Sequence, residues 1–440
     1  IQKRLPDNYY IVGFSRTPKT REQFQKEFAE RVRKKEGKYL IEKVLDDLVK
    51  HVHYFAGQYI DRASFDAYRT FLKELTHAKS LTHLAYFSVP PVVFQDIVKH
   101  LSETRPTKKE DLRLIIEKPF GGSLASAEEL FRCVIQYIDE DQIYLLDHYL
   151  GKSSVQSIMH LRHTNRLLNL MMKGPEIANI QITAFEDIGI GERVGYFENT
   201  GIIKDMIQSH LLQTLALVTM SIPITESAAS IHRERLSILS SIQPPRSTKD
   251  IVLGQYAGYK KENGVPHSSN TETFVALRLF IDRESWYKIP IYLRTGKKTE
   301  EKHTFVVVEL KKFSFQKPEE EPNRLIIDIQ PDAKVTINLV NRLGELDKYQ
   351  DVMTNASIAC DIEGCLPDHA ALILDAIKGD KTNFLSFPEI LQTWRITDGI
   401  LETIAKRGVK LESYPDGSRG PTSQDRLTKD DGYRWYDVHA

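Results

Sequence analysis

Short apolar runs alternate with amphipathic stretches in the first part of the chain. The runs are rich in β-forming residues, which predicts buried strands at 9–14, 84–89, 112–116 and 143–146. Phe24, Phe28 and Val32 recur every fourth residue, which predicts a helix over 21–35 that ends at Gly37. A capping-box pattern predicts that a later helix opens with Ser126 and Glu129. Strands that alternate with helices predict a doubly wound, mostly parallel α/β sheet.

The remaining sequence has a different pattern. Residues 201–218 are largely apolar, which predicts a long buried helix. Strand-like runs follow at 273–281, 291–294, 305–310, 325–329 and 335–339. The last run alternates apolar and polar residues, as a strand with one buried face does. We therefore expect an α+β domain with a large, mostly antiparallel sheet backed by helices, whose other face is available to a partner subunit.

Length and composition limit the alternatives. The chain has 440 residues, and we divide it into domains at 1–147 and 148–440. Lys and Arg total 60, as do Asp and Glu, so the net charge of zero argues against a nucleic-acid or anionic-membrane binder. The longest apolar stretch, 211–224, is too short and interrupted to span a membrane. Three cysteines (Cys133, Cys360 and Cys365) make no disulfide framework, and with no apolar leader they indicate a cytoplasmic protein.

Candidate ligand contacts follow three of the predicted strands, because ligands bind beyond the carboxyl ends of strands in open α/β sheets. The first is Ser15-Arg16-Thr17, where an arginine among hydroxyls suits the 2′-phosphate of NADP, or is a solvated loop residue. The second is Glu117-Lys118-Pro119, where a stiff turn, with a Lys118–Pro119 bond that can be cis, either directs Lys118 into a ligand cleft or merely joins strand to helix.

The third place is 147–152, directly after the strand at 143–146. It brings an acid, an imidazole, a phenol and an amine together before a helix that opens near Ser153. Such a group suits a phosphate ligand, and Asp147 can orient a histidine that lies elsewhere in the fold. The alternative is an ordinary capped turn.

His210 lies within the apolar helix and is either a core residue or a general base. Asp205 precedes it by five residues, and five α-helical steps turn by about 140°, so we expect the two on different faces, from which they could still flank one cavity.

Several motifs resemble the glucose-6-phosphate dehydrogenase family, in order and over nearly the whole chain. The most specific is LDHYLGK at 146–152. The others are IEKPFG at 116–121, GIIKDMIQSH at 201–210, LRTGK at 293–297, TWR at 393–395 and GSRGPT at 417–422.

The resemblance implies oxidation of glucose 6-phosphate at C1 to 6-phosphoglucono-lactone with hydride transfer to NADP, the entry step of the pentose phosphate pathway. By that resemblance His210 is the general base and Asp147 orients it. The implied substrate-binding residues are Lys118, His148, Tyr149, Lys152, Glu186, Asp205, Lys297 and Lys302. The implied coenzyme contacts are Arg16, Tyr86 and Lys118. No metal is implied, and the expected assembly is a homodimer or homotetramer through the antiparallel sheet.

The family opens with a strand and a Gly-x-x-Gly-Asp-Leu turn that holds the coenzyme pyrophosphate, and this chain starts after that point. We expect this chain to be an N-terminally incomplete part of a longer protein. The longer protein would contain the first strand and the glycine turn of the coenzyme domain. The alternative is a non-catalytic hexose-phosphate-binding protein that lacks a working coenzyme site.

Overall fold

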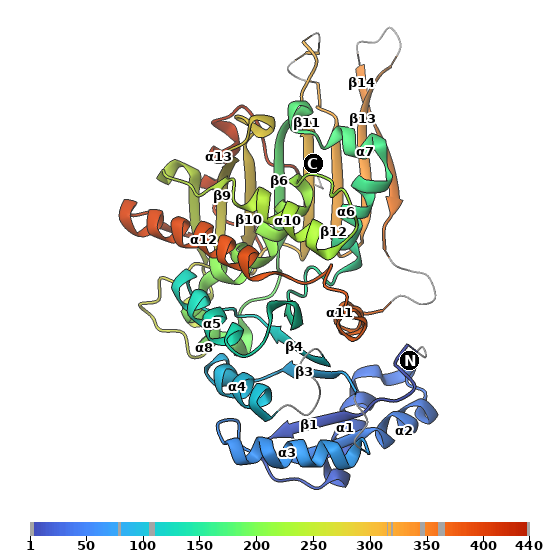
Figure 1. The fold of residues 1–440 in the computed structure, drawn as a ribbon. Helices are drawn as coiled ribbons and strands as arrows, with labels where there is room; N and C mark the ends of the chain where they lie inside the picture. Colours follow the sequence, from blue (N-terminus) through green and yellow to red (C-terminus); the bar gives the residue numbers. More distant parts are fainter. Residues whose placement is uncertain are drawn as a thin grey trace. The chain divides into compact units, whose positions relative to one another are not determined.

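The computed structural model describes residues 4–77, 81–104, 111–314, 316–317, 320–343, 348–359 and 366–437 (Figure 1). The chain forms two compact units. The first comprises residues 1–121, 128–146 and 370–380, and the second comprises 122–127, 147–369 and 381–440. Cys360 and Cys365 lie outside the described residues.

Parallel strands flanked by helices form the first unit. Its strands are β1 (Ile11–Ser15), β2 (Val52–Ala56), β3 (His83–Phe87), β4 (Leu112–Glu117) and β5 (Ile143–Leu146). Its helices are α1 (Arg21–Glu36), α2 (Glu42–Lys50), α3 (Arg62–Leu75), α4 (Phe94–Thr104), most of α5 (Leu124–Ile135) and most of α11 (Asp368–Lys378). Strand β1 pairs with β2, and separately β3, β4 and β5 pair in that order, all in parallel. The predicted Rossmann-like parallel arrangement is confirmed.

Local sequence explains the helix ends in this unit. Thr20 and Gln23 form a capping box at the start of α1, and Gly37 ends the helix with a positive φ of 51°. The predicted start of the next helix at Ser126 is wrong, since α5 already begins at Leu124. The Ser126 hydroxyl accepts the backbone N–H groups of Gly122 and Ser123, so it caps from inside the first turn.

A mostly antiparallel sheet dominates the second unit. Its strands are β6 (Ile177–Phe185), β7 (Ile242–Gln243), β8 (Ile251–Tyr256), β9 (Phe274–Ile281), β10 (Ile291–Gly296), β11 (His303–Leu310), β12 (Arg324–Gln330), β13 (Lys334–Leu343), β14 (Lys348–Ser357) and β15 (Leu411–Tyr414). Their order is β14-β13-β12-β11-β6-β10-β9-β8-β15, and β7 pairs with β9. Among the described strand pairs of this large sheet, only β6–β10 and β8–β15 are parallel, so the predicted sheet type is confirmed.

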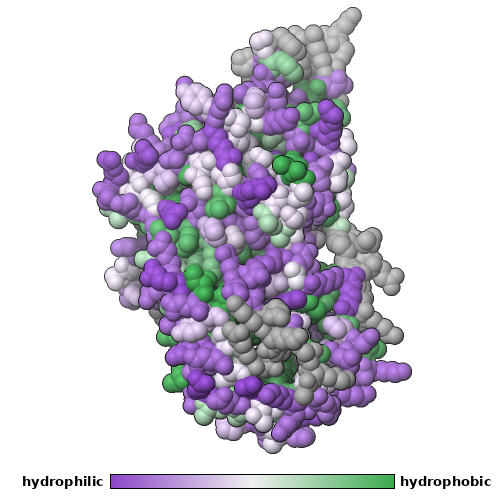
Figure 2. Space-filling model, in the orientation of Figure 1, coloured by the Kyte–Doolittle hydropathy of each residue, from purple (hydrophilic) through white to green (hydrophobic). Residues whose placement is uncertain are grey.

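Helices cover one face of this sheet (Figure 1). The helices of this unit are α6 (Ser153–Thr164), α7 (Arg166–Met171), α8 (Val194–Ile202), α9 (Leu212–Thr219), α10 (Ala228–Leu239) and α12 (Phe387–Arg407), with the short α13 (Asp425–Lys429) near the C-terminus. Among them, α6, α10 and α12 lie in front of the sheet in Figure 1. The side that carries the helices shows mainly hydrophilic residues, with hydrophobic ones in small groups (Figure 2). On the other face Tyr436 packs against Phe305, Val307 and Ile326, so the C-terminal segment covers part of the sheet.

The predicted continuous helix over 201–218 is wrong in its detail. Gly201 has φ 66° and ψ 172°, which interrupts the helix one residue before the end of α8. A π-helix, η7 (Ile203–Leu211), follows and continues into α9. The apolar pattern correctly identified a buried segment, but a glycine outside the α region and the wider i→i+5 turn divide it into three parts.

Candidate active site

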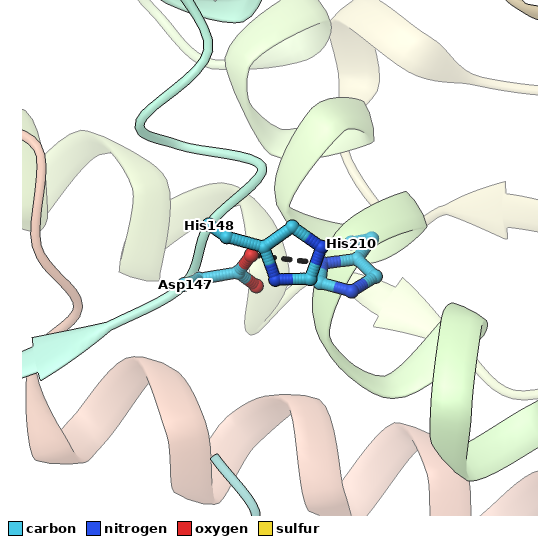
Figure 3. Close-up of side chains that lie close together, drawn as sticks. All are labelled: Asp147, His148 and His210. Carbon is cyan, nitrogen blue, oxygen red and sulfur yellow. Dashed lines mark hydrogen bonds and ion pairs between the residues drawn. The ribbon is translucent and has the colours of Figure 1, made fainter. Parts of the chain in front are cut away.

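An acid–base pair lies at the centre of the candidate site. Asp147 directly follows β5, and His210 comes from η7 (Figure 3). The Oδ1 atom of Asp147 lies 2.8 Å from Nδ1 of His210, and both side chains are at most 2% exposed. Because a carboxylate can only accept, Nδ1 donates its hydrogen and the basic lone pair of the ring is on Nε2. The backbone N–H of Tyr149 donates to the same Oδ1 atom at 2.8 Å, which fixes the carboxylate.

Aromatic rings surround His210. The Tyr149 ring is stacked on it with centroids 4.1 Å apart, and the His148 ring meets its edge at 4.5 Å. Burial raises the pKa of Tyr149, so its phenol stays protonated at neutral pH. These contacts hold the orientation of the imidazole on both sides.

Lys152 extends the cluster away from His210. Its Nζ atom lies 4.4 Å from the centre of the Tyr149 ring and donates to Oε1 of Gln330 at 2.6 Å. Burial lowers the pKa of Lys152; the carboxylate of Asp368 opposes this effect, and the positive charge of Lys302 adds to it. Two cations therefore act on one region beside the aromatic pair, an arrangement that suits an anionic ligand.

A second polar group joins the ends of two neighbouring strands. Lys297 follows β10 and lies 2.6 Å from Oε2 of Glu186, which follows β6, and 3.4 Å from Oδ2 of Asp205 on η7. The exposed guanidinium of Arg193 lies 3.6 Å from the other Asp205 oxygen. Alternating acids and bases at one edge of the sheet offer several hydrogen-bonding atoms to a polyhydroxylated ligand.

Asp205 and His210 belong to the same part of the site, although an α-helix would place residues five apart on different faces. The i→i+5 turn of η7 returns the chain towards the same side after five residues. The α-helical premise of that expectation is therefore wrong, because the segment that carries both residues is a π-helix.

The second unit thus holds most of the predicted site residues. They are Asp147, His148, Tyr149, Lys152, Glu186, Asp205, His210, Lys297 and Lys302. Gln330, Thr304 and Arg193 were not predicted. The only sequence indication for Gln330 and Thr304 is their place at adjacent strand ends, where the Gln330 amide donates to the Thr304 hydroxyl at 2.9 Å.

The predicted coenzyme contacts lie in the first unit. The exposed Arg16 follows β1, with its guanidinium carbon 5.4 Å from the centre of the Tyr59 ring. Tyr86 on β3 donates to the carboxylate of Glu117 at the end of β4, and the Lys118–Pro119 peptide bond is cis. A cation between the hydroxyls of Ser15 and Thr17 at a parallel strand end fits the phosphate of a dinucleotide.

Asp147, His148 and His210 also satisfy a distance criterion for a metal site. One potential ligand atom from each lies within 4.8 Å of the others (Figure 3). Two of these three residues, Asp147 and His210, are hydrogen-bonded to each other, and we interpret them as an acid–base pair.

Comparison with known proteins identifies the family. The model of the "Glucose-6-phosphate dehydrogenase, NAD binding domain" matches residues 1–157, and that of the "Glucose-6-phosphate dehydrogenase, C-terminal domain" matches 159–436. The chain belongs to the glucose-6-phosphate dehydrogenase family. Among the relatives of this dehydrogenase chain, glucose-6-phosphate 1-dehydrogenase of Chlamydia muridarum is 34% identical, over 98% of this chain and 91% of the relative.

Solved structures agree with this family assignment. The glucose-6-phosphate 1-dehydrogenase of Mycobacterium avium superimposes with a TM-score of 0.85 at 30% identity, covering 98% of this chain and 92% of the other. A glucose-6-phosphate dehydrogenase in complex with its substrate glucose 6-phosphate gives a TM-score of 0.89 at 27% identity, covering 97% and 91%. Within the described part of this family member, no helix is long and apolar enough to cross a membrane.

Proposed function

We propose that the protein oxidises glucose 6-phosphate at C1 to 6-phosphoglucono-lactone, with NADP as the hydride acceptor. The observation that carries the proposal is the buried Asp147–His210 pair, in which one ring nitrogen is held by a carboxylate and the other carries the lone pair. The substrate named for the relatives supports the choice of sugar phosphate.

His210 acts as the general base. Its Nε2 atom removes the proton of the C1 hydroxyl, and the carboxylate of Asp147 stabilises the imidazolium that forms. The nicotinamide coenzyme, when bound, supplies the hydride acceptor. The proton and the hydride leave one carbon centre and its hydroxyl, so this proposal assigns no step to a metal ion.

Two sets of residues near His210 bind different parts of the sugar phosphate. His148, Tyr149, Lys152 and Lys302 bind the phosphate, for which the cation pair is suited. Glu186, Asp205 and Lys297 bind the sugar hydroxyls, as their alternating donors and acceptors allow. Lys118 of the first unit is assigned to both the sugar and the coenzyme, and Arg16 and Tyr86 to the coenzyme alone.

We assign the enzyme to the cytoplasm, on the basis of the sparse cysteines in its sequence.

The first experiment follows NADPH absorbance with the full chain, glucose 6-phosphate and NADP. Replacing His210 with Asn should lower kcat by about 10²- to 10⁴-fold, as expected for loss of a general base. The same substitution at His163, which is partly exposed and paired with Glu226, should leave kcat unchanged. An unaltered kcat in His210→Asn would remove His210 from the role of base. Glucose 6-phosphate binding without NADPH formation by the wild-type chain would support the non-catalytic alternative.

A further inference from the structure

Glu272 contacts the start of the π-helix that carries Asp205 and His210. It lies just before β9, outside the groups assigned above to substrate or coenzyme. Its backbone oxygen accepts the N–H of Ile202 at 3.0 Å, and its Oε1 atom accepts the N–H of Ile203 at 3.3 Å. One residue thus provides acceptors for two of the N–H groups that the first turn of a helix leaves without partners.

The contact is close enough to require glycine opposite it. A Cβ atom on Gly201 would lie 2.3 Å from Oε1 of Glu272, and the positive φ of Gly201 is itself unfavourable for other residues. The interruption at Gly201 therefore leaves room for the carboxyl group at the start of η7.

The next residue, Thr273, is tied to Lys297. Its backbone oxygen accepts the N–H of Lys297 at 2.9 Å. The hydroxyl of Tyr414 lies 3.1 Å from the Thr273 hydroxyl and donates to the Lys297 backbone oxygen at 2.6 Å. Residues 272 and 273 consequently connect the helix that holds His210 with the strand end that holds Lys297.

We propose that Glu272 is a positioning residue for the reaction: its two acceptors fix the start of η7 and thereby the places of Asp205 and His210 relative to Lys297. The inference rests on the proposed function. A π-helix is a rare form with little stability of its own, so its setting depends on contacts at its ends. Glu272 supplies such a contact at the N-terminal end of η7, which precedes both Asp205 and His210.

The chemistry of the contact indicates which substitution keeps it. Burial raises the pKa of Glu272 to about 7, so ionised and protonated forms coexist near neutral pH. Either form presents an oxygen to the N–H of Ile203, and the side-chain amide of glutamine does the same. Alanine removes this acceptor.

The test compares Glu272→Ala, Glu272→Gln and Glu309→Ala in the full chain. Glu309 is a buried carboxylate on β11 that accepts from Asn179 and Arg324. Its loss destabilises the same unit without touching η7. For each protein we would measure kcat, KM for glucose 6-phosphate, the thermal unfolding temperature and amide hydrogen exchange over residues 202–211.

Glu272→Ala should lower kcat roughly tenfold to a hundredfold, the range that small misplacements of catalytic groups cause, and should speed exchange over 202–211. Glu272→Gln should restore kcat and protection from exchange. Glu309→Ala should lower the unfolding temperature while kcat, measured well below that temperature, stays at the wild-type value.

Three results would overturn the inference while leaving the proposed function intact. They are wild-type kcat in Glu272→Ala, wild-type exchange over 202–211 in that variant, and an equal loss of kcat in Glu272→Gln. An inactive wild-type chain is a different result, because it would overturn the proposed function and this inference together.

Discussion

Arg16 is the residue on which the proposed coenzyme preference depends. Its exposed guanidinium follows β1 beside two hydroxyl residues. Because a charge-assisted contact to the 2′-phosphate is available only with NADP, Arg16→Ala should raise KM for NADP at least tenfold while KM for NAD changes little. Steady-state kinetics with both coenzymes measure this.

Arg33→Ala is the matched control, since Arg33 is an exposed arginine of the same unit that pairs with Glu42. It should leave both KM values unchanged. Equal losses for NADP and NAD in Arg16→Ala would contradict the assignment to the 2′-phosphate.

At the scale of single residues, the sequence predicted candidate site residues that directly follow a recognisable strand. Asp147 was predicted from its place after a buried strand, and its bond to His210 joins residues 63 positions apart. Glu272 and Gln330 were not predicted, because neither stands in a recognisable motif of reactive residues, as Asp147 does. Gln330 ends β12, and packing of β12 against α6, not local sequence, brings it to Lys152 directly before that helix.

The interruption of the helix at Gly201 is an element-scale feature with a direct test. Gly201→Ala should lower the free energy of unfolding by about 2–4 kcal/mol, since it adds backbone strain and a clash with Glu272. Gly195→Ala in α8 is the control, because its Cβ would meet no atom within 4 Å. It should be neutral or slightly stabilising. Urea unfolding distinguishes the two, and equal stability of the two variants would be evidence against the strained glycine.

His303 predicts a pH dependence in the pairing of β11 with β12. Burial lowers its pKa, but contacts with Asp328 at 2.8 Å and Glu301 at 3.3 Å outweigh that effect and raise it. The stabilisation is therefore complete below the unfolded histidine pKa of about 6.5 and is lost as the pH rises through the folded value. His303→Asn should cost more stability at pH 5.5 than at pH 8.5.

His232 provides the opposite case, since burial lowers its pKa. His232→Asn should cost more stability at the higher pH, measured by the same urea titrations. A pH-independent cost at His303 would show that its ion pairs do not contribute.

The sequence predicted many elements but missed β6, near the centre of the large sheet. Asn179, Gln181 and Thr183 alternate with apolar residues there, so a period of two was present. All three polar side chains are fully buried. They are buried because the C-terminal segment covers that face, where the Gln181 amide donates to the backbone oxygen of Arg434. Such long-range cover is invisible in a local pattern.

The whole molecule is expected to associate through the sheet face opposite the helices. Ile326 lies on that face, because it belongs to the cluster that Tyr436 covers. Thr336 pairs with Ile326, and Asn338 is two residues further along the same strand, so both share this face. Met353 pairs with Asn338 and therefore points to it as well. Met353 is 57% exposed. Light scattering should give a mass of two or four chains of 50.6 kDa each.

Met353→Glu should weaken this association, whereas Val352→Glu, on the opposite face of the same strand, should not. A single-chain mass for the wild-type protein would contradict association through this sheet.

One connection within the first unit could not be predicted from the sequence. Residues 370–380 belong to this unit although they follow nearly the whole sheet of the second. The Arg113 guanidinium of β4 donates to the backbone oxygens of Ala376 and Ile377. An arginine inside an apolar strand gives no indication of a partner so far along the chain.

That connection has a consequence for synthesis on the ribosome. Domains generally fold in the order in which they are made. The ribosome adds about 5–20 residues per second. The partner of Arg113 is separated from it by 263 residues. At those rates about 13–50 seconds of translation pass before this contact can form. The first unit therefore cannot be completed until residues 370–380 have been synthesised. A chain terminated before residue 376 would lack the partner of Arg113 permanently.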